Sequence, residues 1–213
     1  MNAIVVGQIV NYHPMDKTYH LPAEHAALLT RAASSDNRAT FFQHISGLAC
    51  VEDAILECFY KGGGVPYSEF KRFHKVMAED SGQTIVAALE EHILPVIPGL
   101  VDRLTEGIDV LDVGCGSGRA INKLARLFPA SRFTGYAVSE EAIATATAEA
   151  QQQHLSNVQF QVKDAATLDA AEQYDLITTF DAIHDQARPD LVLRNIYNAL
   201  RSENGVYLMQ DCS

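Results

Sequence analysis

Residues 110–120 constrain the fold of this chain more than any other stretch. They read Val-Leu-Asp-Val-Gly-Cys-Gly-Ser-Gly-Arg-Ala, so an apolar run that includes Asp112 leads into Gly114, Gly116 and Gly118. Glycine takes a positive φ without steric cost and lets the backbone come close to a ligand. The pattern therefore predicts a buried strand, a glycine turn and a helix whose first N–H groups face a ligand. An ordinary strand-to-helix turn and a dinucleotide site remain alternatives, although the dinucleotide spacing is Gly-x-Gly-x-x-Gly.

The rhythm of the sequence after residue 108 extends this pattern into a domain. Apolar segments and amphipathic segments alternate, which favours an α/β fold with a doubly wound parallel sheet. The expected strands are 109–113, 132–138, 158–163, 175–180 and 205–210, and the expected helices are 118–128, 139–154 and 189–201. In such sheets ligands bind beyond the carboxyl ends of the strands, beside the first strand.

The segment before this domain is mixed in character. Residues 3–20 alternate weakly around a turn, which favours a β-hairpin, and a helix is expected from about Pro22 to residue 30. Further helices are expected at 37–59, 68–79 and 83–97, interrupted by three glycines at 62–64. We therefore expect three parts: residues 1–35, a helical linker or lid at 36–98, and the α/β domain at 99–213.

Composition excludes several classes of protein. The chain has 213 residues and a net charge of −11, and both halves contain more acidic than basic residues, which disfavours nucleic-acid binding. No apolar run approaches the ~18 residues of a membrane span, and no signal peptide is recognisable. A reducing cytoplasm is expected, because no CxxC or zinc spacing relates the four cysteines, Cys50, Cys58, Cys115 and Cys212.

The motif Asp-x-Gly-x-Gly-x-Gly resembles motif I of the class I S-adenosylmethionine (SAM) dependent methyltransferases. With LPAEHAALLT at 21–30, GGGVPY at 62–67 and DAIHDQARP at 181–189, the chain is similar to one group of these enzymes over nearly its whole length. That group has an N-terminal winged helix and a mycobacterial member, and its methyl acceptor is generally unassigned. The resemblance implies a Rossmann-like sheet in the order 3-2-1-4-5, a small-molecule acceptor, and a winged-helix remnant at 1–35 that mediates homodimerisation.

The resemblance also implies which residues contact SAM. The methionine end of SAM would lie against the glycine turn, formed by Asp112, Gly114, Cys115, Gly116 and Gly118. The ribose and adenine would be held by Ala137, Val138, Asp164 and Ala165, and the sulfonium would lie beside Phe180 and Asp181. On spacing alone, a turn residue is the alternative interpretation of Asp164.

Ala137 departs from the family pattern, which has Asp or Glu at this position to bind the ribose hydroxyls. Loss of this charged contact is expected to cost on the order of 1.5–3 kcal/mol of binding free energy. Glu140 or Glu141 could replace it, but acidic residues at a helix start also simply favour the helix dipole.

A histidine beside an aspartate follows the fourth expected strand. His184 with Asp185 is the candidate general base, and His184 with Tyr67 would contact the acceptor. The alternative is that His184 and Asp185 cap the helix beginning near Pro189 or line the pocket. Many methyl transfers need only proximity, because SAM is already activated.

The ends of the chain raise a rival interpretation. The resemblance implies that a C-terminal helix and strand pair are missing and that the chain begins inside its winged helix, so we expect a protein shortened at both ends. The strand at 205–210 would then be an exposed sheet edge. Together with Ala137, this supports a non-catalytic SAM-binding or dimerisation module as the alternative function.

Overall fold

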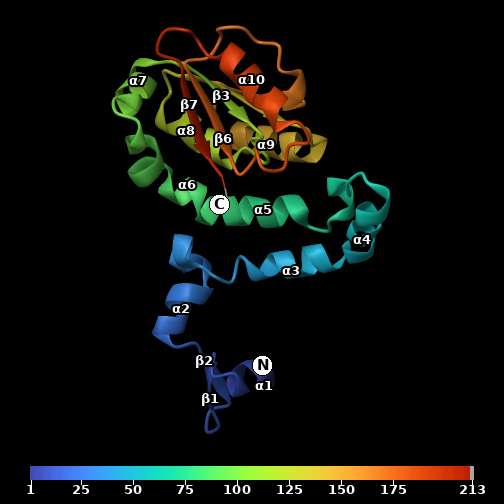
Figure 1. Cartoon of the computed structure of the whole chain (residues 1–213). Coiled ribbons are helices and arrows are strands. Elements are labelled where there is room, and N and C mark those ends of the chain that lie inside the picture. The colour runs from blue at the N-terminus through green and yellow to red at the C-terminus, as the bar shows by residue number, and fades with distance from the viewer. Residues whose placement is uncertain (212–213) are drawn as a thin grey trace. The chain divides into compact units, whose positions relative to one another are not determined.

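The computed structural model describes residues 1–211, apart from the side chains at positions 34 and 35. The chain divides into two compact units, Met1–Ala87 and Ala88–Ser213 (Figure 1). Each unit is described by itself.

The second unit is built on a five-stranded parallel sheet in the order β5-β4-β3-β6-β7, which confirms the expected topology (Figure 1). In chain order the strands are β3 (Asp109–Val113), β4 (Arg132–Ala137), β5 (Val158–Val162), β6 (Leu176–Phe180) and β7 (Val206–Gln210). The central strand β3 pairs with β4 on one side and β6 on the other. The crossover from β5 back to β6 creates the switch point beside β3, where such folds bind ligands.

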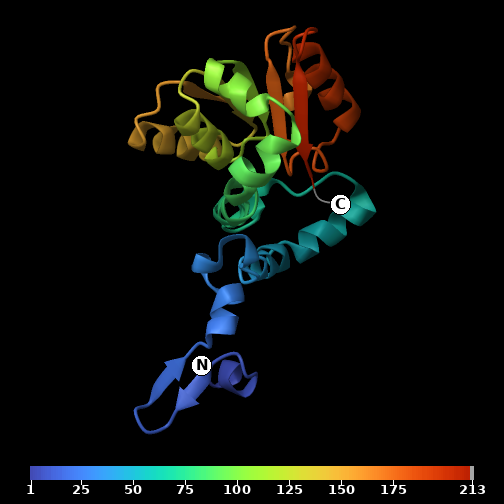
Figure 2. The same cartoon turned by 90° about the vertical axis from the view of Figure 1, so that its left-hand side faces the viewer.

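Helices cover both faces of this sheet (Figure 2). They are α7 (Leu100–Glu106), α8 (Arg119–Leu127), α9 (Glu140–Gln152) and α10 (Pro189–Ala199), with a short 3-10 helix η5 (Ala165–Thr167). Alternation along β3 separates two cores: Val110 packs with Leu104 and Ile121, whereas Leu111 packs with Ile196. This is the double winding that the strand–helix rhythm predicts.

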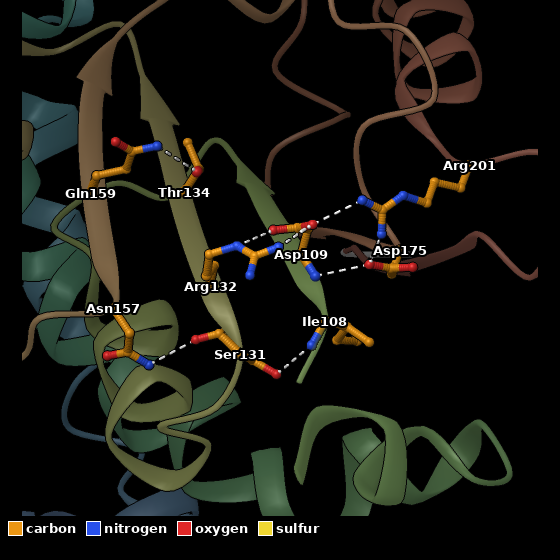
Figure 3. Close-up of polar contacts among 9 residues, drawn as sticks. All are labelled: Ile108, Asp109, Ser131, Arg132, Thr134, Asn157, Gln159, Asp175 and Arg201. Atoms are coloured by element: carbon orange, nitrogen blue, oxygen red, sulfur yellow. Dashed lines mark hydrogen bonds and ion pairs between the residues drawn. The ribbon is translucent and has the colours of Figure 1, made fainter. Parts of the chain in front are cut away.

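Hydrogen bonds and ion pairs between charged and polar side chains connect the amino ends of the strands (Figure 3). Arg132 donates two hydrogen bonds to Asp109, at 2.7 and 2.8 Å. Arg201 contacts both Asp109, at 2.9 Å, and Asp175. This network joins β4 and β3 to the residue before β6 and to the segment after α10, at the end of the sheet opposite to the glycine turn.

The first unit begins with a helix, so the expected hairpin over 3–20 is wrong for its first part. The elements are α1 (Asn2–Val6), β1 (Asn11–His13), β2 (Thr18–His20), α2 (Ala23–Leu29) and the 3-10 helix η1 (Arg31–Asp36). Only β1 and β2 pair, antiparallel, and Asp16 closes their turn by accepting from the Thr18 hydroxyl at 2.9 Å. The branched residues at 4–6 satisfy their backbone locally instead, since Val5 N–H reaches the Met1 carbonyl at 3.1 Å.

The rest of the first unit contains more breaks than the sequence pattern predicts. Its elements are α3 (Phe42–Ala49), α4 (Glu52–Lys61), η2 (Tyr67–Glu69), α5 (Phe73–Gln83) and α6 (Ile85–Ala88), at whose end the second unit begins with η3 (Leu89–Ile93) and η4 (Leu94–Val96). The single period at 37–59 is two helices, with buried Val51 at the break. The expected helix at 68–79 begins late, because Arg72 has a φ of 63°.

No single helix in the described part of the chain is long and apolar enough to cross a membrane, and only the bent pair Phe73–Val96 with Leu100–Glu106 meets those limits together.

Candidate active site

The three glycines of the turn after β3 all have positive φ, at 81°, 52° and 73° for Gly114, Gly116 and Gly118. Two of them are also required by packing. A Cβ on Gly114 would lie 2.5 Å from the Cβ of Ala182, and one on Gly118 would lie 2.6 Å from the Cβ of Ala146. The chain therefore needs glycine at these positions to close the turn against the loop after β6 and against α9.

Gly116 is different, because a Cβ added there would meet nothing within 4 Å. Packing does not explain a glycine with a φ of 52° beside open space. The turn is held in place around it, since the N–H groups of Gly114 and Cys115 donate to the Tyr136 carbonyl at 2.8 and 2.9 Å. A bare backbone facing open space is what close approach by a ligand requires.

Asp112 lies beneath this turn and is 2% exposed. Burial raises the pKa of its carboxyl to about 7, even though Thr178 Oγ1 donates a hydrogen bond to Oδ1 at 2.8 Å. One hydrogen bond does not offset the loss of hydration. A cationic amino group close to this carboxylate would supply the missing compensation, so the site fits the amino-acid end of SAM. Burial, and the nearby Asp112, also raise the pKa of the Cys115 thiol.

The end of β4, where the resemblance places the ribose of SAM, has alanine and no carboxylate at position 137. Ala137 ends β4 and is 9% exposed, and the exposed Val138 follows it. Ser139 caps α9 by accepting from the Ala142 N–H at 3.2 Å. Glu140 and Glu141 lie exposed in the first turn of that helix, where a negative charge is favourable without any ligand.

Asp164 lies at the end of β5 and caps η5. Its Oδ1 accepts from the Ala166 N–H at 2.8 Å, and buried Ala165 begins the short helix. The sequence left a turn role and an adenine contact as alternatives. The structure shows the turn role, because the Asp164 side chain caps η5. Its second carboxylate oxygen leaves room for both roles, so the adenine contact stays a prediction.

The loop after β6 lies against the end of β7. Phe180 pairs in register with Gln210, and the Asp181 N–H donates to the Gln210 carbonyl at 2.9 Å. Asp181 has a φ of 47°, which is rare for a residue other than glycine. The chain turns sharply here and brings His184 back towards β7.

The imidazole of His184 is engaged by Asp211, a residue that the sequence analysis missed. Nδ1 of His184 hydrogen-bonds Asp211 Oδ1, and the N–H groups of Ile183 and His184 donate to Asp211 Oδ2 at 3.1 and 3.2 Å. Nε2 of His184 lies 3.5 Å from Asp185 Oδ1. The available signal was the position of Asp211, directly after the last strand at the edge where ligands bind.

These carboxylates raise the pKa of His184 above its ordinary value. The hydrogen bond to Asp211 is the main cause, partial burial acts in the opposite direction, and the charges of Asp185, Asp211 and Asp181 add to the rise. His184 and Asp185 do not cap α10. The N-cap position of this helix is occupied by Arg188, which makes no side-chain cap hydrogen bond.

Tyr67 belongs to the first unit, where its ring stacks on Phe73 with centroids 4.8 Å apart. Its contact with the acceptor stays a prediction. Among the described residues, no group of three or more His, Cys, Asp or Glu is arranged to hold a metal ion.

Similarity to known proteins covers both parts of the chain. A methyltransferase domain family matches residues 104–213, and the Rv2258c-like winged HTH domain matches residues 1–31. Malonyl-[acyl-carrier protein] O-methyltransferase of Bacillus cereus is 29% identical over 161 residues, 74% of this chain and 52% of the relative. The mitochondrial ubiquinone biosynthesis O-methyltransferase of Saccharomyces cerevisiae is 28% identical over 102 residues, 48% of this chain and 33% of the relative.

A solved structure from Methanococcus maripaludis, provisionally assigned as a SAM-dependent methyltransferase, shares the fold with a TM-score of 0.55 and 21% identity. The matched region covers 66% of this chain and 63% of the Methanococcus maripaludis chain. This chain spans about half the length of the Bacillus cereus relative and a third of the yeast one. The resemblance in motif and topology is thereby confirmed, and the chain belongs to the methyltransferase domain family, with relatives that are SAM-dependent methyltransferases and an Rv2258c-like winged HTH segment at its N-terminus.

Proposed function

We propose that this protein transfers a methyl group from SAM to a small-molecule acceptor. The observation that carries the proposal is the corner at the switch point, where the backbone at Gly116 faces open space above the buried carboxyl of Asp112. SAM supplies a methyl group made electrophilic by the sulfonium. The protein therefore has only to bind SAM and the acceptor, orient them, and remove a proton from the acceptor. We expect this to take place in the cytoplasm; Cys50, Cys58 and Cys115 are free thiols, and Cys212 lies outside the described residues.

Each side chain has a defined task in this proposal. Asp112 would accept from the amino group of SAM, and the turn from Gly114 to Gly118 would lie along its methionine end. Ala137 and Val138 would face the ribose and Asp164 and Ala165 the adenine. Phe180 ends β6 and Asp181 follows it, and both would lie beside the sulfonium. His184, with Asp185 next to it, would act as general base towards the acceptor.

Calorimetry of SAM and S-adenosylhomocysteine tests the cofactor assignment on the wild-type chain, Ala137→Asp and Asp112→Asn. We expect micromolar binding by the wild-type chain and about tenfold to a hundredfold tighter binding by Ala137→Asp, because a charged hydrogen bond to the ribose is restored. Asp112→Asn should bind far more weakly, since the neutral amide cannot compensate the amino charge. Absence of binding by both the wild-type chain and Ala137→Asp, with each shown to be folded, would overturn the proposal.

The buried, uncharged Ala137 favours a second candidate, a non-catalytic SAM-binding or dimerisation module. Transfer of labelled methyl from SAM to small molecules of a bacterial extract separates the two. A chain that binds SAM but labels nothing above the level of Asp112→Asn would support the module. Measurement of its mass in solution would then show whether the expected homodimer forms.

A further inference from the structure

We propose that Asp211 is the positioning residue for His184, and that this pair prepares the site for an uncharged hydroxyl acceptor rather than a carboxylate. The inference rests on the proposed function, because it assigns the acceptor chemistry of that same site.

The first support is the way in which the two loops are held together. Asp211 follows β7 and His184 lies in the loop after β6, and these strands pair through their last residues, Phe180 with Gln210. The Asp211 carboxylate then makes three contacts with that loop, one to the imidazole and two to the backbone N–H groups of Ile183 and His184. A carboxylate held by two backbone donors cannot follow the imidazole if it rotates, so the ring orientation is determined by the sheet.

The second support is the tautomer of the His184 imidazole that the contact with Asp211 selects. A carboxylate accepts only, so the hydrogen bond assigns a proton to Nδ1 of His184. In the neutral ring the lone pair is then on Nε2, which is not bound to Asp211 and lies 3.5 Å from Asp185 Oδ1. The His184 side chain is 39% exposed whereas that of Asp211 is 13% exposed. The His184 imidazole can therefore contact an acceptor, while Asp211, which orients it, remains largely buried.

The third support is the charge around the ring. Among the described residues, the charged groups that act on His184 are Asp181 and Asp185 from its own loop and Asp211 directly after β7, and all three are carboxylates. An acceptor that is itself a carboxylate would be repelled by them. A carboxylate is also already ionised near neutral pH and needs no base, whereas a phenol or alcohol keeps its proton there, with a pKa of about 10 for a phenol. A fixed base among acidic groups therefore suits a neutral hydroxyl.

The step balances with the groups already named. The acceptor O–H bond breaks and its proton passes to Nε2 of His184, while the acceptor oxygen forms the new bond to the methyl carbon. The carbon–sulfur bond of the donor breaks with its electron pair remaining on sulfur, so S-adenosylhomocysteine leaves uncharged at sulfur. The imidazolium that forms is stabilised by Asp211 and later loses its proton to water.

Titration of the His184 imidazole by NMR tests the positioning role without any acceptor. His184→Gln identifies the signal, and Asp190→Asn is the matched control, because Asp190 pairs with exposed Arg188 away from the imidazole. We expect a pKa above that of an ordinary histidine in the wild-type chain and in Asp190→Asn, and a lower pKa in Asp211→Asn. An unshifted pKa in the wild-type chain would overturn the assignment by itself, whether or not Asp211→Asn folds.

Product chemistry tests the acceptor class. Labelled methyl transferred to extract small molecules is treated first with mild alkali, which cleaves methyl esters, and then with hydriodic acid, which cleaves methyl ethers. We expect the label to resist alkali and to be released by the acid, and turnover to fall at least about tenfold in Asp211→Asn and about a hundredfold or more in His184→Gln. SAM affinity should stay within about twofold in both.

The failures are distinguishable. Loss of SAM binding in the wild-type chain would contradict the proposed function. Normal SAM binding with alkali-labile label, or with turnover unchanged in Asp211→Asn, would contradict the present inference alone.

Discussion

Thr178 Oγ1 donates to Asp112 Oδ1 at 2.8 Å in a part of the sheet where both side chains are fully enclosed, and this bond joins β6 to β3 directly below the glycine turn. The carboxyl nevertheless has a pKa raised to about 7 by burial. The residue that we propose to hold the charged amino group of SAM is thus destabilised in its charged form when no ligand is present.

The stability of the ligand-free protein should therefore decrease as the pH rises from about 4 to 7. The unfolded chain loses the Asp112 proton near its ordinary pKa, whereas the folded chain keeps it until about pH 7, so the folded state binds the extra proton in this window. A difference of about three pKa units corresponds to about 4 kcal/mol as an upper range. Urea unfolding at several pH values measures the slope, and Asp112→Asn should flatten it. An equal slope in Asp112→Asn would show that other groups cause it.

SAM affinity should show the opposite dependence on pH. The ionised Asp112 carboxylate attracts the amino group, so affinity should increase as the pH approaches and passes 7, and should decline once the amino group of SAM loses its charge above about pH 8. Calorimetry across this range checks the bell shape. A profile that is flat from pH 5 to 8 would mean that Asp112 does not contact the amino group.

Gly114→Ala and Gly116→Ala should separate packing from ligand contact. The first places a methyl 2.5 Å from Ala182 and should lower the free energy of unfolding by about 2–4 kcal/mol, as overpacking and backbone strain combine. The second meets nothing within 4 Å, so its cost should be limited to the strain of about 1–2 kcal/mol, while SAM binding should be lost. Thermal melts and calorimetry report the two effects. Unchanged SAM affinity in a folded Gly116→Ala would contradict the site.

Arg201→Met should cost more stability than Arg132→Met. Arg201 is 40% exposed at its side chain and contacts both Asp109 and Asp175, whereas Arg132 is 76% exposed and contacts Asp109 (Figure 3). We expect about 1–2 kcal/mol for the first and a smaller loss for the second, because solvent screens exposed pairs. Neither should change SAM affinity, since both lie at the amino ends of the strands. A reversed order of melting temperatures would contradict this ranking.

Local patterns were sufficient for much of the second unit. An apolar strand followed by an amphipathic helix recurs between residues 108 and 210, and each strand of the sheet lies within two residues of its expected bounds. The glycine turn was also recognisable, because its φ requirements are expressed directly in the residue types. The first unit departs from the prediction at α1, where the segment is short and apolar, and such segments form a helix as readily as a strand.

Resemblance to the class I methyltransferases supplied the order of the strands, whereas local sequence patterns by themselves determined the α/β class and the position of Asp112 ahead of a glycine turn. These follow from hydrophobic periodicity and from backbone restrictions, which act over a few neighbouring residues. Only the tertiary structure decided that Gly116 faces open space while Gly114 is packed against Ala182. It likewise paired His184 with Asp211, 27 residues apart, because β6 and β7 end side by side and no local pattern records which side chains meet across two adjacent strand ends.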